Sequence, residues 1–499
     1  MARCRSTTSR SRARRWRGAA RARACREARV DAITLSAAEL AAVTGGRLLA
    51  GDPERRVGRL TIDSRALAAG DLFVAIRGAR FDGHEFVAAA LAAGAAGAVV
   101  ARAPGVPEAG HGRPAPILLQ VADTTRALQD IARDVRRRSG SRVVAITGSA
   151  GKTTTKELTA AFLAAKYDVF RNEGNLNNQI GLPLSLLELR MRPDVAVVEL
   201  GMNHPGEIRT LVGIAEPDVR VWTNVGDAHM GFFASADAIA DAKAEILESA
   251  RPTDLLVANA DDARVMARAS RFAGRTVTFG FGERADVRAI EVRQLGLDGT
   301  SATVRTPRGS TALATPLLGL GNLANVLAAT AVAIDFDVPL EEIASRADAT
   351  RPAPRRGELL RLPGGITVID DSYNSSPAAL MRALDVVRAA TGSARKVAVL
   401  GEMLELGDHA ADLHRQCGRA AAAVGLNLLI AVGGSPAREL AEAAIAAGMP
   451  ASVVHHVATS DEATTLALQK IRPGDLVLVK GSRGIRTDLV VERLKAEYA

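Results

Sequence analysis

The stretch Arg142–Leu158, RVVAITGSAGKTTTKEL, runs from a short apolar segment through a turn with a glycine at each end into a helix-like segment. Gly148 and Gly151 let the backbone turn its N–H groups toward an anion, and the start of the following helix adds the positive end of its dipole. Lys152 can reach the terminal phosphates of a nucleotide, and the hydroxyl of Thr153 can bind Mg²⁺. The stretch therefore predicts a loop that holds the phosphates of a nucleoside triphosphate.

The spacing of this loop differs from the common pattern G-x-x-x-x-G-K-[ST], which would require a glycine at Ile146. The chain has the shorter spacing T-G-x-x-G-K-T, and we count Ser149 and Thr154 among its nucleotide-binding residues. A glycine-rich turn unrelated to phosphate is the alternative. The apolar run before the loop and the helical pattern after it both favour the phosphate loop.

Alternation of apolar runs with helical segments continues on both sides of the loop. VVAI, DVAVVEL, VRVWTNV and DLLVAN predict a mostly parallel, covered sheet, and GLGNLANVLAATAVAI predicts a helix that begins at a glycine. RPAPRRG indicates a linker, after which ITVIDDSYN, KVAVLGEM, LNLLIAVGG and DLVLVKGSRG predict a second doubly wound domain. We therefore expect an α/β protein of three domains: a small α/β domain over 31–138, a central phosphate-loop domain over 139–350 and a Rossmann-like domain over 351–499.

The composition limits the function classes. The chain has 499 residues and a formal net charge of +9, but residues 1–30 contain eleven Arg and one Glu, so the rest is close to neutral. A basic nucleic-acid-binding body is therefore not expected. No apolar run is long enough for a membrane span. Only Cys417 of the three cysteines lies outside the tail, which fits a reducing cytoplasm. The tail suggests a disordered extension; an organellar transit peptide and an RNA-binding arm are the alternatives.

Polar residues follow two of the apolar runs. Glu199 ends VAVVEL, and His229 follows VRVWTNV in the segment NVGDAHMGFF. Residues just past the carboxyl ends of parallel strands converge on one crevice, where a carboxylate and an imidazole can help to position a metal beside the triphosphate. A solvated loop carboxylate and an ordinary packed histidine are the alternatives.

Further candidates come from an amide-rich turn and from the last domain. Asn175, Asn177 and Asn178 lie in GNLNNQIGLP, where they either fix a loop or offer hydrogen bonds to a polar ligand. Asp371 and Asn374 follow a strand-like run, and an Asp there meets a ribose hydroxyl or caps the next helix. Arg483, in GSRG, offers a fork for a carboxylate or phosphate. Helix capping is at least as good an explanation for each of these taken singly.

Taken together, the motifs resemble the Mur ligases, the ATP-dependent amide-forming enzymes of peptidoglycan synthesis. The resemblance covers the chain from about Ile33 to the C-terminus and is carried, in order, by TIDSR, FDGHEF, TGSAGKTTTKE, GNLNNQIGLPLSLL, ELGMNHPGEI, NVGDAHMGFF, GLGNLANVLAA, DDSYNSSPAAL, LGEMLELG and VLVKGSRG. NSSPAAL stands where the family member that adds the third peptide residue has H-T-P-D-A-L, and the D-N-P-R segment of its diaminopimelate-binding forms is missing. These differences favour the member that adds a dipeptide.

The resemblance implies roles for individual residues. Ser64 and Arg65 would hold the UDP-sugar end of the substrate, and Asn322 would contact adenine. Lys243 matches a lysine that related ligases carbamylate, which would make it an anionic ligand of Mg²⁺ beside Thr153, Glu199 and His229. Arg356 and Asp371 would reach phosphate and ribose from the last domain. The family usually has a glycine before this arginine; Arg355 stands there, so the register is open by one residue.

The implied activity is the ATP-dependent joining of D-alanyl-D-alanine to UDP-MurNAc-tripeptide through an acyl phosphate. The catalytic residues would be Lys152, Lys243 and His229, the cofactors ATP and Mg²⁺, and the chain a cytoplasmic monomer. A sister amide ligase such as folylpolyglutamate synthase would share the nucleotide loop but has no reason to keep TIDSR and FDGHEF. The other alternative is a regulatory protein that binds nucleotide and hydrolyses ATP slowly.

Overall fold

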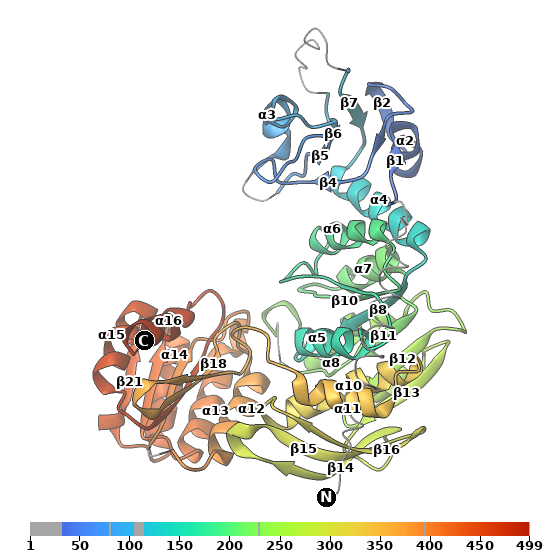
Figure 1. Cartoon of the computed structure of the whole chain (residues 1–499). Coiled ribbons are helices and arrows are strands. Elements are labelled where there is room, and N and C mark those ends of the chain that lie inside the picture. Colours follow the sequence, from blue (N-terminus) through green and yellow to red (C-terminus); the bar gives the residue numbers. More distant parts are fainter. Residues whose placement is uncertain (1–31, 79–80, 104–113, 228–229, 394, 499) are drawn as a thin grey trace, which may run out of the picture. The chain divides into compact units, whose positions relative to one another are not determined.

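The computed structural model describes residues 32–78, 81–103, 114–227, 230–393 and 395–498. The chain divides into two compact units, Met1–Ser141 with Pro183–Asp194, and Arg142–Leu182 with Val195–Ala499 (Figure 1). The Arg-rich tail, residues 1–30, lies outside the described residues. No helix in the described part of the chain is both long and apolar enough to cross a bilayer.

The first unit is built on a five-stranded sheet in the order β2-β7-β6-β5-β4. The strands β4 (Leu60–Thr61), β5 (Leu72–Val74), β6 (Gly97–Val100) and β7 (Ile117–Gln120) are parallel, and β2 (Arg47–Ala50) joins β7 antiparallel. The helix that precedes the phosphate loop in the chain is α4 (Thr124–Ser139). Other elements are β1 (Leu35–Ser36), α2 (Ala37–Thr44), β3 (Arg56–Val57) and α3 (Val87–Ala92).

A nine-stranded sheet forms the central domain of the second unit, in the order β16-β15-β14-β13-β12-β11-β8-β10-β9. The strand before the phosphate loop, β8 (Arg142–Thr147), lies between β10 (Val195–Glu199) and β11 (Val219–Trp222) and is parallel to both. Parallel pairing continues through β9 (Val169–Arg171), β12 (Leu255–Asn259), β13 (Arg275–Gly280) and β14 (Val287–Gln294). The carboxyl ends of β8, β10 and β11 therefore meet at one edge, as the sequence predicted.

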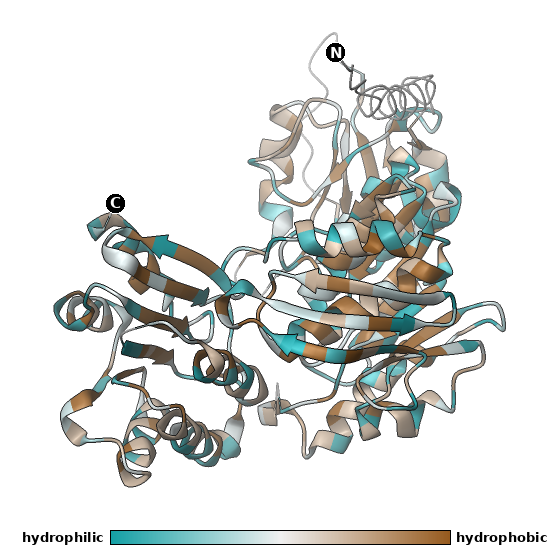
Figure 2. Cartoon of the chain, turned by 60° about the horizontal axis from the view of Figure 1, so that its bottom comes forward, coloured by the Kyte–Doolittle hydropathy of each residue, from teal (hydrophilic) through white to brown (hydrophobic). Residues whose placement is uncertain are grey.

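The antiparallel end of this sheet was not expected from the sequence. β15 (Thr300–Thr306) and β16 (Gly309–Thr315) extend it from β14 by antiparallel pairing. Apolar and polar residues alternate along these two strands because one face of each is exposed. The parallel strands, in contrast, are continuous apolar runs (Figure 2). The sheet is mostly parallel, but its edge is a meander.

Helices α5 (Lys152–Leu163) and α10 (Gly319–Asp335) pack against each other beside the central sheet. The expected glycine-started helix is α10; eleven of its seventeen residues are buried, and its apolar side chains belong to the same core as Val144, Ile146 and Leu158. The other helices of this domain are α6 (Gly181–Leu186), α7 (Glu207–Ala215), α8 (Ala236–Ala244), α9 (Ala263–Ala269) and α11 (Leu340–Ala349).

The C-terminal domain of the second unit has a six-stranded sheet, β17-β18-β22-β19-β20-β21. The four predicted runs are β18 (Ile366–Asp371), β19 (Arg395–Gly401), β20 (Leu428–Val432) and β22 (Asp475–Lys480), all parallel. The edge strands β17 (Glu358–Leu362) and β21 (Val454–Val457) were missed because most of their residues are only partly buried, which leaves a weak apolar pattern. Its helices are α12 (Pro377–Ala389), α13 (Ala410–Ala423), α14 (Ser435–Ala446), α15 (Ser460–Lys470) and α16 (Asp488–Glu497).

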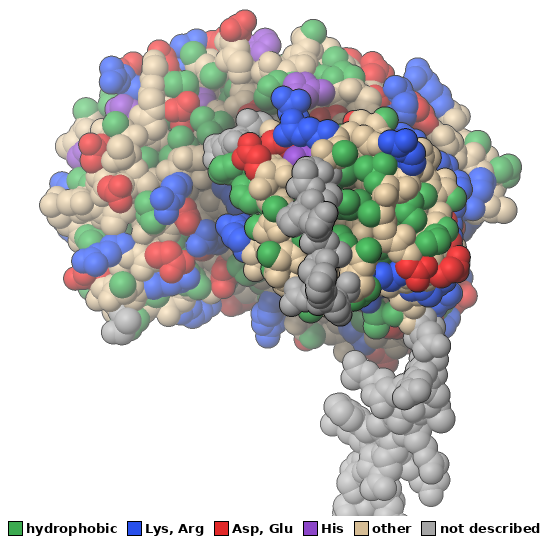
Figure 3. Space-filling view, turned by 90° about the horizontal axis from the view of Figure 1, so that it is seen from above, with side chains coloured by type: hydrophobic (Ala, Val, Ile, Leu, Met, Phe, Trp, Pro, Cys, Tyr) green, Lys and Arg blue, Asp and Glu red, His purple; other side chains and the backbone are tan. Residues whose placement is uncertain are grey.

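Acidic and basic side chains are interspersed on the face of the molecule shown in Figure 3. The described residues on that face present no continuous basic field. This agrees with the near-neutral charge of the sequence beyond the tail.

Candidate functional site

The phosphate loop joins β8 to α5 and contains two glycines, both of which have a positive φ. Gly148 has φ +151°, and a Cβ there would lie 1.9 Å from Oγ1 of Thr223. Gly151 has φ +83°, and its Cβ would lie 2.3 Å from Oδ1 of Asn325. Any side chain would therefore clash at either position, which explains why the sequence has glycine at both.

The loop is held in shape by the segment that follows β11. The N–H of Ala150 donates to Oδ1 of Asn224 at 2.9 Å, and Thr223 Oγ1 donates to the Ala150 carbonyl at 2.8 Å. Ser149 exchanges hydrogen bonds with the backbone of Gly226. The segment after β11 thus fixes the loop without using the N–H groups at the start of α5.

The N-terminus of α5 is open to the cavity. Gly151 is its N-cap, and no side chain caps it. The first N–H groups of a helix have no acceptor within the helix, so those of Lys152, Thr153 and Thr154 are available to an anion. All three residues line the cavity described below.

Lys152 lies at the centre of this positive region. Its ammonium donates to the Gly148 carbonyl at 2.8 Å, inside the curve of the loop. Burial lowers the pKa of Lys152, Glu199 opposes that shift, and Arg356 adds to it. The loop therefore holds a cation whose charge would be stabilised by an anionic ligand.

Glu199 is fixed on two sides. One carboxylate oxygen accepts from the hydroxyl of Thr153 at 2.7 Å and the other accepts from Nδ2 of Asn177 at 2.8 Å. Its backbone N–H donates to Oδ1 of Asn172 at 3.0 Å. Because Glu199 is 4% exposed, its carboxylate is held in place beside Lys152. The carboxylate and the hydroxyl of Thr153 together offer two kinds of oxygen ligand.

Lys243 lies on α8 and is 1% exposed. Burial lowers its pKa well below the usual value, and the charge of Lys152 lowers it further, so the two lysines are close enough to interact. His229 lies outside the described residues. Among the residues that are described, no cluster of three His, Cys, Asp or Glu side chains forms a metal site by itself.

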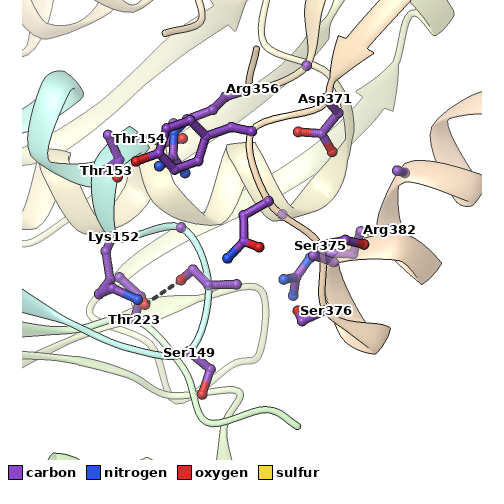
Figure 4. A pocket seen from close by; sticks show the side chains of 18 of the residues that line it. Ser149, Lys152, Thr153, Thr154, Thr223, Arg356, Asp371, Ser375, Ser376 and Arg382 are labelled. Carbon is purple, nitrogen blue, oxygen red and sulfur yellow. Dashed lines mark hydrogen bonds between the residues drawn. The ribbon is translucent and has the colours of Figure 1, made fainter. Parts of the chain in front are cut away.

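A cavity of about 1280 Å³ opens above the phosphate loop and is lined by both the central and the C-terminal domain of the second unit. Figure 4 shows Lys152 and Thr153 facing it from one side, and Arg356, Asp371 and Arg382 from the other. The predicted residues on its wall are Ser149, Gly151, Lys152, Thr153, Thr154, Asn175, Asn178, Glu199, Asn322, Arg356, Asp371, Asn374 and Arg483. Residues separated by more than 300 positions in the chain thus share one cavity.

The two arginines of the linker face in different directions. Arg355 turns away and pairs with Asp488, its Nη1 2.8 Å from Oδ2. Arg356 lines the cavity, with its guanidinium 4.0 Å from the centre of the Tyr373 ring. The guanidinium of Arg483 lies 5.7 Å from the same ring centre.

Asp371 is already paired within the protein. Lys480, which is nearly fully buried, places its ammonium 2.7 Å from Oδ2 of Asp371 and 2.9 Å from the carbonyl of Asn374. This pairing ties the end of β18 to the end of β22. It also satisfies the charge of the one carboxylate that ends β18 in the cavity.

The predicted asparagines differ in whether their side chains hold the local backbone in place. Asn178 accepts from the N–H of Gly181 at 2.8 Å, so it fixes the start of α6. Asn322 donates to the Leu318 carbonyl at 2.9 Å and accepts from Asn325. Asn175 lines the cavity and its carbonyl accepts from the N–H of Asn177.

Ser64 and Arg65 belong to the first unit. Arg65 forms a bidentate pair with Asp63, with Nε 2.9 Å and Nη2 2.8 Å from its two oxygens, and its side chain is 88% exposed. The side chain of Ser64 is partly buried beside this pair.

Several residues of the site were not found from the sequence. Asn172 fixes Glu199, and Lys480 and Tyr373 shape the C-terminal wall of the cavity. A lysine that ends the buried run LVLVK was the available signal for Lys480. Arg382 had no signal, because one arginine in a helical pattern is indistinguishable from a solvated residue before the fold is known.

The family models match three parts of the chain: the Mur ligase family, catalytic domain, over 56–136; the Mur ligase middle domain over 146–333; and the Mur ligase, glutamate ligase domain over 355–483. A UDP-N-acetylmuramoyl-tripeptide–D-alanyl-D-alanine ligase of Synechocystis is 38% identical over 448 residues, which cover 89% of this chain and 93% of the relative.

Solved structures agree. MurF from Acinetobacter baumannii superimposes with a TM-score of 0.84 at 32% identity, covering 94% of this chain and all of that chain. MurF ligase from Thermotoga maritima in complex with ADP gives a TM-score of 0.76 at 28% identity, covering 88% of this chain and 97% of that one. The predicted three-domain α/β fold and the predicted resemblance are confirmed, and the chain belongs to the Mur ligase family.

Proposed function

We propose that the chain uses ATP to join D-alanyl-D-alanine to UDP-MurNAc-tripeptide, giving UDP-MurNAc-pentapeptide, ADP and phosphate. The observation that carries the proposal is the cavity itself. The uncapped start of α5, Lys152 and the Thr153–Glu199 pair face a C-terminal wall rich in arginine across a space large enough for nucleotide and reactants. The names of the relatives supply the substrates.

The chemistry requires activation of a carboxylate, whose leaving group would otherwise be oxide. A carboxylate oxygen of the tripeptide bonds to the γ-phosphorus of ATP as the bond to ADP breaks. The amine of the dipeptide then attacks the acyl carbon, the bond to phosphate breaks, and the nitrogen loses a proton. The main barrier is bringing together reactants of like charge, so preorganised positive charge is the main catalytic contribution.

Individual residues of the chain fit this task. The N–H groups at the start of α5 and the ammonium of Lys152 are directed at the place where phosphates would lie. Arg356 would approach the phosphates from the C-terminal domain, and Asp371 would approach the ribose. Asn322 would contact the adenine. We assign the peptide and dipeptide ends to Asn175, Asn178, Asn374 and Arg483, and the UDP-sugar end to Ser64 and Arg65.

The residues also fit Mg²⁺, which prefers oxygen ligands and supplies charge neutralisation at the phosphates when bound. Thr153 and Glu199 would hold it, and their hydroxyl and carboxylate already lie together. His229 and a carbamylated Lys243 complete the proposed set. Burial favours the neutral amine of Lys243, which is the form that can react with carbon dioxide.

We also propose the domain bounds 31–138, 139–350 and 351–499, a monomeric state and a cytoplasmic location. The bounds are supported by the separate sheets and by the three family matches. Small-molecule substrates require no second subunit, and sedimentation of the purified chain tests the monomer.

A phosphate-release assay coupled to product analysis tests the proposed function. The full chain is given ATP and a panel of UDP-MurNAc peptides with D-alanyl-D-alanine, glutamate or no amine donor. We expect phosphate and pentapeptide in equal amounts only with the tripeptide and the dipeptide. Turnover with glutamate would favour a ligase of the folylpolyglutamate synthase kind, and donor-independent phosphate release would favour a slow ATPase.

A further inference from the structure

Arg382, on the inner face of α12, lines the cavity but has no role so far in the proposed function. Its side chain reaches from the helix into the cavity, toward the side where Ser149 and Lys152 lie (Figure 4). Among the described residues, its guanidinium has no hydrogen bond or ion pair. A guanidinium always carries a positive charge. A partly buried guanidinium without a neighbouring anion therefore costs free energy, unless a bound ligand supplies the anion.

The position of the side chain is set by packing. The helix α10 has Gly321 opposite the stem of Arg382, and a Cβ at that glycine would lie 2.8 Å from Cδ of the arginine. The stem therefore lies directly on the backbone of α10, next to Asn322. A side chain at position 321 would displace it.

The other end of Arg382 borders the phosphate loop. Together with Ser149 and Ala150 it lines a small recess between the two domains of the second unit. The guanidinium thus lies between the phosphate loop and the start of α10. Those are the two places that the proposed function assigns to the phosphates and the adenine of ATP.

Among the described residues of the C-terminal domain, no carboxylate forms an ion pair with Arg382. Asp371 is the carboxylate whose charge acts on it, but Asp371 is in contact with Lys480 at 2.7 Å. Burial lowers the pKa of Arg382, in keeping with a site that disfavours an uncompensated cation. Arg356 and Arg483 add further positive charge around Tyr373.

We propose that Arg382 binds the phosphate chain of the nucleotide from the C-terminal domain, opposite Lys152 and the start of α5. The inference rests on the proposed function for the identity of the nucleotide. Its place beside Ser149 and Ala150, rather than beside the amide loop at Asn175, favours a phosphate over a substrate carboxylate. Contacts from both domains to one phosphate chain would also couple nucleotide binding to the arrangement of the two domains.

Calorimetric titration of the full chain with ADP and with adenosine tests the proposal at fixed salt and Mg²⁺. Arg382→Gln and Arg382→Met remove the charge, and Met keeps an unbranched stem on Gly321. Both should raise the Kd of ADP about tenfold or more, because a charge-assisted contact is lost, and leave the Kd of adenosine unchanged. Arg382→Lys should fall between them and the wild type.

Arg419→Gln is the matched control, since Arg419 is exposed on α13 of the same domain. It should leave the Kd of ADP within about twofold of the wild type. Adenosine binding reports whether each variant is folded.

An ADP Kd unchanged in both neutral variants overturns the proposal. So does a loss confined to the KM of the dipeptide or the UDP-peptide, which would assign the guanidinium to a carboxylate. A wild type that binds ADP but forms no amide would refute the proposed function while leaving this inference intact.

Discussion

Lys152 is held by the loop that it is proposed to serve, since its ammonium donates to the Gly148 carbonyl. Lys152→Ala removes the buried cation but leaves the glycines, Thr223 and Asn224 that shape the loop. We expect pentapeptide formation to fall by at least about a hundredfold, as for loss of a preorganised electrostatic contact.

The measurement is product formed per minute, with circular dichroism to confirm the fold. Lys166→Ala is the control, because Lys166, which follows α5, donates to the carbonyls of Phe336 and Asp337 after α10 and does not line the cavity. Wild-type turnover in Lys152→Ala would contradict the phosphate-loop assignment.

Lys243 is the second buried lysine of the site, and its proposed carbamylation has a chemical test. Lys243→Ala leaves space where an anionic ligand would stand. We expect activity to be lost in this variant and partly regained with added short-chain carboxylates, measured as rate against carboxylate concentration. Full activity without any addition would argue against the modification.

Among the elements, the loop after β19 contacts the central domain of the second unit. The N–H of Gly231 donates to the Glu405 carbonyl at 2.8 Å, and a Cβ at Gly407 would lie 2.8 Å from the Cα of Gly231. Gly407 also has φ +55°. Two glycines are therefore needed where the loops from the central and C-terminal domains meet.

Gly407→Ala should lower stability by two effects, the strained φ and the contact with Gly231. Gly425→Ala is the control, because Gly425 has φ +79° but nothing within 4 Å of its Cβ position. We expect Gly425→Ala to cost about 1 kcal/mol and Gly407→Ala roughly 1 kcal/mol more, measured by urea unfolding. Equal losses would mean that the contact contributes nothing.

Helix α13 carries a buried histidine that supports the same loop. Nε2 of His414 accepts from the N–H of Met403 at 2.9 Å, and Nδ1 contacts the Ala410 carbonyl at 2.7 Å. Burial lowers the pKa of His414 below its usual value near 6.5, against smaller opposing effects of the Ala410 carbonyl and Glu402. Protonation would remove the acceptor for Met403.

Because the folded state holds His414 neutral, the unfolded state takes up the proton first as the pH falls. The contribution of His414 to stability is therefore complete above about pH 6.5 and is lost progressively below it. We expect the unfolding free energy of the wild type to fall more steeply between pH 7 and 5.5 than that of His414→Gln. Parallel curves would show that His414 does not titrate with unfolding.

At the scale of the whole molecule, the Arg-rich residues 1–30 account for the net positive charge, and the rest of the chain is nearly neutral. Its Mur ligase matches begin only at residue 56. We expect deletion of residues 1–30 to leave kcat and the KM of each substrate unchanged in the phosphate-release assay. A marked loss would give the tail a role in the reaction.

The chain sequence was sufficient for the glycine-bracketed loop, the mostly parallel sheet around it and the three-domain α/β class. These features depend on local patterns: apolar runs, glycine positions and residues that follow strand ends. The strands β15 and β16 and the edge strands β17 and β21 escaped prediction because partly buried strands carry a weaker apolar pattern.

The sequence by itself determined which residues end the strands and turn the loops, because those choices depend on neighbours a few positions away. Only the tertiary structure decided that Arg356 rather than Arg355 faces the cavity and that Lys480 neutralises Asp371. It also decided that Arg382 has no ion-pair partner in the described part of the chain. Each of these depends on contacts between segments far apart in the chain. A charged residue becomes informative only when the groups that surround it are known.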